Sequence, residues 1–211
     1  MTTLTTRWTV LGAALGLAGV LALPKGTGSE ADELAIIAAA PERFLVGNAL
    51  TFAATALIGI GLLVLARGCA GHGHRGTAVL LRIAAAGWLL HTALIAHNAV
   101  SYELAAMDDR GAATELAAQI YAGPVFLGLL LPMLALTVLG MVAAGVALWR
   151  TGHAPPWAAA ALALALVSDF VTPETFSGIP MFGLLLLAFL GLREAGGRHA
   201  VPAGVEPAHA A

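Results

Sequence analysis

The chain has 211 residues, of which 59% are hydrophobic and only 10% are charged. A soluble domain carries about 25% charged residues, so this composition excludes an ordinary water-soluble protein. The apolar residues form several separate runs of membrane-spanning length, without the alternation of barrel strands. The sequence therefore predicts an all-α fold, a polytopic transmembrane helix bundle in the plasma membrane of a bacterium.

Charge and cysteine content exclude further classes of protein. The formal net charge is −2, and no basic stripe is present that would bind nucleic acid. The lone Cys69 excludes an internal disulfide, a four-cysteine zinc site and a C-x-x-C redox pair. We expect no cofactor, and we expect the lipid bilayer and a lipophilic small molecule as partners.

The first apolar run, 8–23, follows a short basic lead-in. Such a start also fits a signal peptide, but no clear A-x-A cleavage site follows, which favours a retained first span. The acidic loop 25–43 comes next. Within it we expect a short surface helix over 29–40, with Ser29 as its N-cap and Asp32 three residues further on.

Five more apolar runs predict five more spans, which brings the total to about six. These runs cover 44–66, 78–100, 124–150, 157–171 and 179–192. Pro132 lies inside the fourth span and should kink it. An acidic loop separates the third span from the fourth. We expect one transmembrane domain, 1–193, followed by a disordered polar tail, 194–211.

The arginines predict the orientation of this bundle. In a six-span topology, most of them fall on one side of the membrane, and most of the acids fall on the other. The arginines on the first side are Arg7, Arg67, Arg75, Arg150, Arg193 and Arg198. Because basic residues favour the cytoplasmic side, both termini are expected in the cytoplasm.

A polar stripe marks the third predicted span. At about 100° per residue, Trp88, His91, Asn98 and Tyr102 share one helix face, and His97 points to nearly the opposite side. Polar groups in a membrane must be satisfied without water, so the stripe indicates the wall of a polar pocket. The simpler interpretation is that these side chains only bind a neighbouring helix, at roughly 0.6–2 kcal/mol each.

Asp169 on the fifth predicted span matches His91 in depth. A helix rises about 1.5 Å per residue, which places each side chain roughly 20 Å from the cytoplasmic end of its span. This match favours a common site in which proton transfer can occur. Alternatively, Asp169 lies at the frayed end of its helix and is simply solvated.

Metal and haem sites find less support. Cys69, His72 and His74 form a C-x-x-H-x-H pattern that could hold a soft or borderline metal. A flexible glycine-rich linker explains the pattern more simply, so we predict no metal site. A bis-histidine haem needs histidines on two facing helices, whereas both intramembrane histidines lie on the third span. Walker, G-x-S-x-G and H-E-x-x-H motifs are absent from the sequence.

Three short motifs carry a resemblance over residues 7–193. They are AAAPERF at 38–44, RG at 67–68 and GW at 87–88. On these motifs the chain resembles small six-helix actinobacterial integral membrane proteins, which include small integral-membrane terpene cyclases of meroterpenoid and indole-terpenoid pathways. The resemblance implies an isoprenoid substrate, an intramembrane carboxylic acid that protonates its prenyl chain, and aromatic rings that guide the resulting cation.

On this basis we expect acid-initiated cyclisation with Asp169 as the proton donor, held by His91 or Asn98. The expected substrate-binding residues are Trp88, Tyr102, Tyr121, Phe126 and Phe170. The alternative acids are Glu42, Glu103 and Glu174. Two non-enzymatic readings stay open, a small-molecule transporter or sensor and a subunit of a membrane complex. A homo-oligomer is compatible with each.

Overall fold

The computed structural model describes residues 6–25, 28–173 and 176–198, the last six of these as helical backbone only. The described part consists of helices joined by turns and short loops, without a strand, which confirms the predicted all-α class. The alternative acid Glu174 and residues 199–211 lie outside the described residues. The final helix continues to Arg198, so the tail expected from 194 begins inside this helix.

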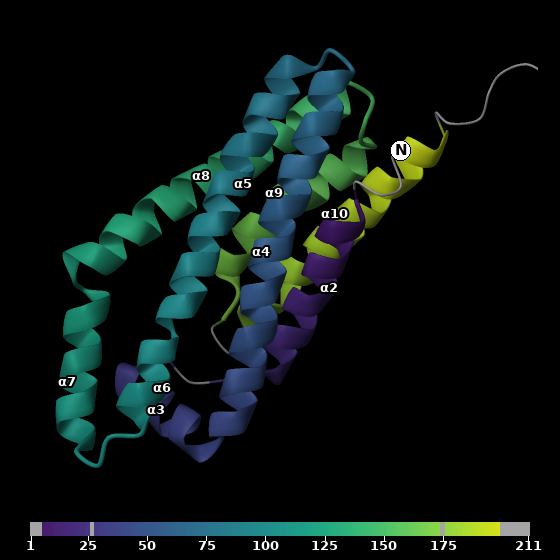
Figure 1. Cartoon of the computed structure of the whole chain (residues 1–211). Helices are drawn as coiled ribbons and strands as arrows, with labels where there is room; N and C mark the ends of the chain where they lie inside the picture. Colours follow the sequence, from purple (N-terminus) through teal and green to yellow (C-terminus); the bar gives the residue numbers. More distant parts are fainter. Residues whose placement is uncertain (1–5, 26–27, 174–175, 199–211) are drawn as a thin grey trace, which may run out of the picture.

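Six helices in the described part of the chain form a closed ring (Figure 1). Each of them packs against the next, and the last returns to the first. The deepest side chains of their shared core include Ile58, Trp88, Phe182 and Phe189. In ring order the helices are α2 (Arg7–Ala22), α4 (Pro41–Gly71), α5 (Arg75–His97), α8 (Pro124–Arg150), α9 (Pro156–Val171) and α10 (Ile179–Arg198).

Three stretches of the described chain are long and apolar enough to cross a membrane. They are α4, the stretch Arg75–Ala105 that includes α5, and α8. The apolar helices Arg7–Ala22, Pro156–Val171 and Ile179–Leu192 are shorter. The structure thus indicates a membrane protein with three candidate spans, and the count of six stays a prediction.

Three shorter helices form a cap at one end of the ring (Figure 1). They are α3 (Glu30–Ala39), α6 (Ala99–Ala105) and α7 (Arg110–Tyr121). The Ser29 side chain accepts a hydrogen bond from Asp32 N at 3.2 Å, which confirms the predicted N-cap of α3. The cap has its own apolar core, in which Leu34, Ile37, Phe44, Leu104, Ala105, Ala113 and Ala117 are buried.

Helices α6 and α7 replace the acidic loop that was expected between the third and fourth spans. Asp109 is the N-cap of α7, because its side chain accepts a hydrogen bond from Ala112 N at 3.0 Å. Ala113 and Ala117 then lie one turn apart and are buried against the cap. The N-cap and the two buried alanines thus place this polar segment in a packed helix.

Glycine allows α5 and α8 to approach each other closely. A Cβ atom on Gly87 would lie 2.4 Å from the backbone nitrogen of Thr137, and one on Gly140 would lie 2.7 Å from the nitrogen of Ala84. Small residues at such crossings let helix backbones come into contact in membranes. This crossing holds Trp88, the residue that follows Gly87, at the centre of the bundle.

Candidate functional site

Asp169 lies in the last turn of α9 and closes the turn into α10. Its Oδ1 atom accepts a hydrogen bond from Ser177 Oγ at 3.2 Å and another from Gly178 N at 2.9 Å. Gly178 has a φ of +79°, a conformation that glycine adopts without strain. Because Gly178 directly precedes α10, Asp169 places its negative charge at the positive end of that helix dipole.

Lys25 reaches the same turn from the segment between α2 and α3. Its Nζ donates a hydrogen bond to the carbonyl oxygen of Ser177 at 3.0 Å, across 152 positions of sequence. Burial lowers the pKa of Lys25 below its usual value, and the nearby Asp169 carboxylate opposes this by raising it. Lys25 is therefore a half-buried cation whose partner charge is Asp169.

His91 on α5 completes this group, which we call the Asp169 cluster: Lys25, His91, Asp169, Ser177 and Gly178. The imidazole of His91 interacts electrostatically with the Asp169 carboxylate. The cluster thus joins α5, α9 and the segments that flank α2 and α10. The cluster contains His91 and Asp169, the two side chains predicted to lie at the same depth. It also contains Lys25, which the sequence patterns did not indicate.

Trp88 stacks on His91 from one turn earlier on α5. The two ring centroids are 5.4 Å apart with an interplanar angle of 23°. The indole is completely buried and also contacts Phe182, at a centroid distance of 6.3 Å. Its Nε1 has no hydrogen-bond partner within the described residues, an arrangement that costs about 1–3 kcal/mol. Trp88 therefore fixes the His91 ring and leaves one buried donor unused.

The other predicted residues lie elsewhere. Asn98 is half-buried at the junction of α5 and α6. Tyr102 belongs to the cap, where its ring stacks on Phe44 at 6.4 Å with an interplanar angle of 15°. Phe170 is 63% exposed on α9. The helix face predicted to carry Trp88, His91, Asn98 and Tyr102 is therefore not continuous. Helix α5 ends before Asn98, and Tyr102 belongs to the next helix, α6.

Tyr121 and Phe126 form an aromatic group with His97. The helical periodicity predicts that His97 lies on the side of its helix opposite to the polar stripe. The ring centroids are 5.0 Å apart for Tyr121 and Phe126, 5.9 Å for His97 and Tyr121, and 5.6 Å for His97 and Phe126. Tyr121 also hydrogen-bonds Ser101. Burial raises the pKa of Tyr121, and the hydrogen bond with Ser101 lowers it. Through these ring contacts, α7 packs against α5 and α8.

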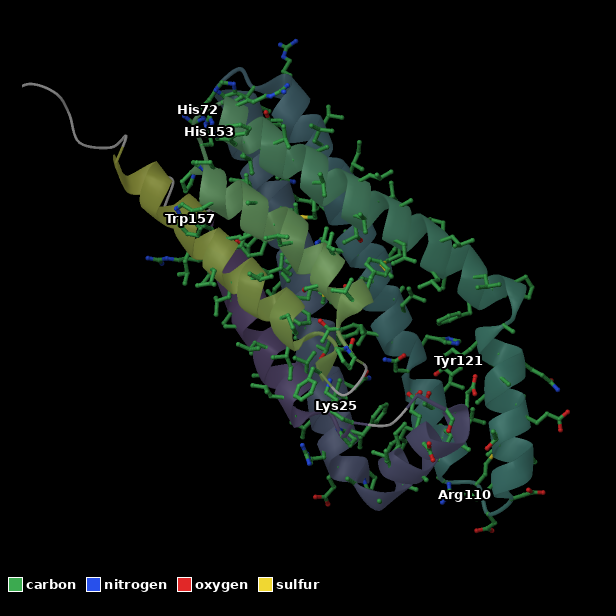
Figure 2. The ribbon with its side chains drawn as sticks, turned by 180° about the vertical axis from the view of Figure 1, so that it is seen from behind. Lys25, His72, Arg110, Tyr121, His153 and Trp157 are labelled. Carbon is green, nitrogen blue, oxygen red and sulfur yellow. The ribbon has the colours of Figure 1, made fainter. Side chains whose placement is uncertain are left out.

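The linker histidines lie at the other end of the bundle. Figure 2 shows His72 and His153 at the end opposite to Tyr121 and Arg110. His72 Nδ1 lies 2.8 Å from the carbonyl oxygen of Gly68. The rings of His74 and His153 pack edge to face, with their centroids 4.8 Å apart. Within the described residues, no group of three or more His, Cys, Asp or Glu side chains is placed to hold a metal ion.

We expect the triple variant Cys69→Ala, His72→Ala, His74→Ala to fold and to reach the membrane like the unmodified chain. His72 hydrogen-bonds to Gly68 of its own helix, and within the described residues no ligand set gathers around these side chains. Metal analysis of the purified unmodified chain and of the variant should give the same content. A stoichiometric metal that disappears in the triple variant would contradict this expectation.

The pocket in the cap is separate from the Asp169 cluster. It has a volume of about 370 Å³ and is lined by parts of α3, α6 and α7 together with the start of α4. Tyr102 is the one predicted site residue on its wall. None of the residues of the Asp169 cluster lines this pocket.

Comparison of the chain with protein-family models, with curated proteins and with solved structures finds no match.

Proposed function

We propose that this chain is an integral membrane enzyme that transfers a proton from Asp169 to a lipophilic isoprenoid substrate and thereby starts a cyclisation. The observation that carries the proposal is the convergence of Asp169 and Lys25 on Ser177, with the His91 imidazole close enough to interact with the carboxylate. Ionisable side chains are expensive within a membrane bundle, and those that occur there usually mark functional sites. The isoprenoid class comes from the resemblance described above.

The hydrogen bonds of Asp169 suit a proton donor. Both bonds to the described residues end on Oδ1, and Oδ2 has no such partner. In the protonated acid, Oδ2 can therefore carry the proton while Ser177 and Gly178 keep the carboxyl group in position. A donor must be held in this way to be within reach of the atom that it protonates.

The proposed reaction needs no co-reactant. The O–H bond of Asp169 breaks, and a C–H bond forms at one carbon of a prenyl double bond, which leaves a carbocation on the other carbon. A second double bond then attacks this cation and closes a ring. Loss of a proton from the final cation to the carboxylate restores Asp169, so the reaction is an isomerisation.

Two neighbours support the charges that arise in these steps. Lys25 stabilises the Asp169 carboxylate after its proton has left, because opposite charges attract strongly where water is scarce. Trp88 stacks on His91, and the π-face of an indole attracts a cation. We therefore assign Asp169 as the acid, His91 and Lys25 as its electrostatic partners, and Trp88 as the aromatic wall.

We also infer that all six ring helices cross the plasma membrane and that both termini are cytoplasmic. The short helices α2 and α9 have 16 residues each and pack in the same ring as the three long apolar stretches. Such a helix is roughly 24 Å long, close to the ~30 Å apolar core of a bilayer once flanking residues are added. The acidic cap then lies outside the cell, opposite to the arginine-bearing ends.

Cysteine labelling tests this topology in a Cys69→Ala background. Single cysteines from Glu30→Cys and Ala112→Cys, both at exposed cap positions, should react with an impermeant thiol reagent in whole cells. The variant Gly76→Cys, at the opposite end, should react only after the cells are opened. Labelling of Gly76→Cys in intact cells, with protection of either cap position, would contradict the proposed orientation.

Conversion of a substrate panel tests the enzyme itself. Membranes that contain the chain should convert at least one farnesylated aromatic compound into a ring-bearing isomer of unchanged mass. Membranes from the same host without the chain serve as the control. If no compound of the panel is cyclised, the proposal fails, and the transporter, sensor or subunit interpretation takes precedence.

A further inference from the structure

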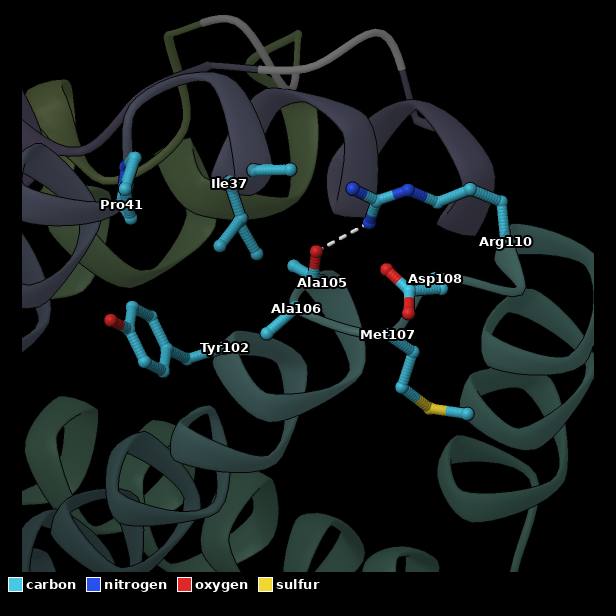
Figure 3. A pocket seen from close by; sticks show the side chains of 9 residues that line it. Ile37, Pro41, Tyr102, Ala105, Ala106, Met107, Asp108 and Arg110 are labelled. Carbon is cyan, nitrogen blue, oxygen red and sulfur yellow. Dashed lines mark hydrogen bonds between the residues drawn. The ribbon is translucent and has the colours of Figure 1, made fainter.

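The pocket in the cap combines an apolar wall with two opposite charges. Its volume of about 370 Å³ falls within the range of small-molecule sites. The apolar wall comes from Ile37 of α3, Pro41 at the start of α4 and the ring of Tyr102. Figure 3 shows Asp108 and Arg110 together at the end of the pocket away from Tyr102.

Arg110 is held in place by the cap itself. One of its guanidinium nitrogens donates a hydrogen bond to the carbonyl oxygen of Ala105, the last residue of α6 (Figure 3). A cation suits this position, because the end of a helix exposes unpaired carbonyl groups. The guanidinium carries five N–H donors, so donors remain for a ligand.

Asp108 lies close to Arg110 in the chain without forming an ion pair with it. Within the described residues, the Asp108 carboxylate forms no hydrogen bond or ion pair, and the only such partner of the Arg110 guanidinium is the carbonyl group of Ala105. Two opposite charges are thus presented at one rim of the pocket, each able to bind an outside group. A purely anionic ligand would meet repulsion from Asp108, and a purely cationic one would meet repulsion from Arg110.

We propose that this pocket binds a zwitterionic amphiphile with a primary ammonium group, a phosphate group and an apolar chain. The ammonium donates hydrogen bonds to Asp108, and the fork of Arg110 matches the phosphate oxygens. The chain lies along Ile37, Pro41 and the Tyr102 ring. Phosphoethanolamine is the shared head-group chemistry, and it occurs both in membrane lipids and as a free solute. This site is independent of the function proposed for Asp169.

Native mass spectrometry of the full chain in detergent tests the pocket. Dilauroyl phosphatidylethanolamine and free phosphoethanolamine are titrated separately, and the bound fraction gives a dissociation constant for each. We expect Asp108→Asn and Arg110→Gln to raise this constant by roughly tenfold, the scale of one lost charge-assisted hydrogen bond. Glu103→Gln is the matched control, because it removes an exposed carboxylate of α6 that does not line the pocket.

The two ligands distinguish the source of the head group. Binding of the lipid alone assigns a membrane lipid, and binding of both assigns recognition of the head group itself. Arg110→Gln also disturbs the contact with Ala105, so Asp108→Asn, which leaves that contact intact, is the deciding variant. Equal binding by Asp108→Asn and the unmodified chain, or equally tight binding of dilauroyl phosphatidylglycerol, which has no ammonium group, would overturn the proposal.

Discussion

Asp169→Asn should lower the rate of cyclisation by at least ~100-fold, the scale of general acid catalysis. The amide removes the transferable proton but retains an oxygen in the position of Oδ1. That oxygen can still accept the hydrogen bonds from Ser177 and Gly178, so the turn between α9 and α10 should persist. We therefore expect the variant to be folded, membrane-inserted and inactive.

Initial rates on the best compound of the prenyl panel measure this effect, with equal amounts of protein in the membrane. Glu103→Gln is the matched control, since it makes the same chemical change at an exposed position of the cap. It should keep full activity. His91→Ala should reduce the rate less than Asp169→Asn, because His91 acts on the acid only electrostatically. Full activity in Asp169→Asn would transfer the role of the acid to one of the alternative acids: to Glu103 if Glu103→Gln is inactive, and otherwise to Glu42 or Glu174.

Gly87→Ala should destabilise the bundle by about 1–3 kcal/mol, the usual cost of overfilling a packed core. The new methyl group would lie 2.4 Å from Thr137 N, which is backbone and cannot rotate away. Helices α5 and α8 must then separate. Because Trp88 is the next residue, its stack on His91 would shift with them.

Thermal unfolding of the purified chain in detergent measures this loss of stability. Gly128→Ala on α8 is the matched control, because its added Cβ would lie within 4 Å of no atom of another helix. Its unfolding temperature should stay close to that of the unmodified chain, whereas that of Gly87→Ala should fall by several degrees. Equal unfolding temperatures for the two variants would show that the crossing of α5 and α8 is loose.

The helices were predictable where strong local signals mark their ends. Helix α8 runs from Pro124 to Arg150 as predicted, because proline suits the first turn of a helix and the apolar run ends at Arg150. Ser29 caps α3 as its spacing to Asp32 indicated. Helix α7 was missed, because its packing depends on contacts with the cap rather than on a long apolar pattern.

The site was predictable only in part. Matching depth indicated His91 and Asp169 as neighbours, and the structure places them in one cluster. Lys25 could not be found in this way, because it lies 152 positions from its partner Ser177. The contacts of His97 with Tyr121 and Phe126 also depend on the fold, since three helices supply the three rings. Helical periodicity describes one helix and says nothing of the helices that pack against it.

Cyclisation in deuterium oxide is the most direct test of Asp169 as the proton donor. A carboxylic acid exchanges its proton with solvent, so the first C–H bond formed in the reaction should become a C–D bond. We expect the product to carry deuterium at the protonated carbon, and we expect Asp169→Asn to lose this product while Glu103→Gln forms it normally. A ring-bearing product without deuterium, or one labelled equally fast by Asp169→Asn, would contradict the proposed role of Asp169.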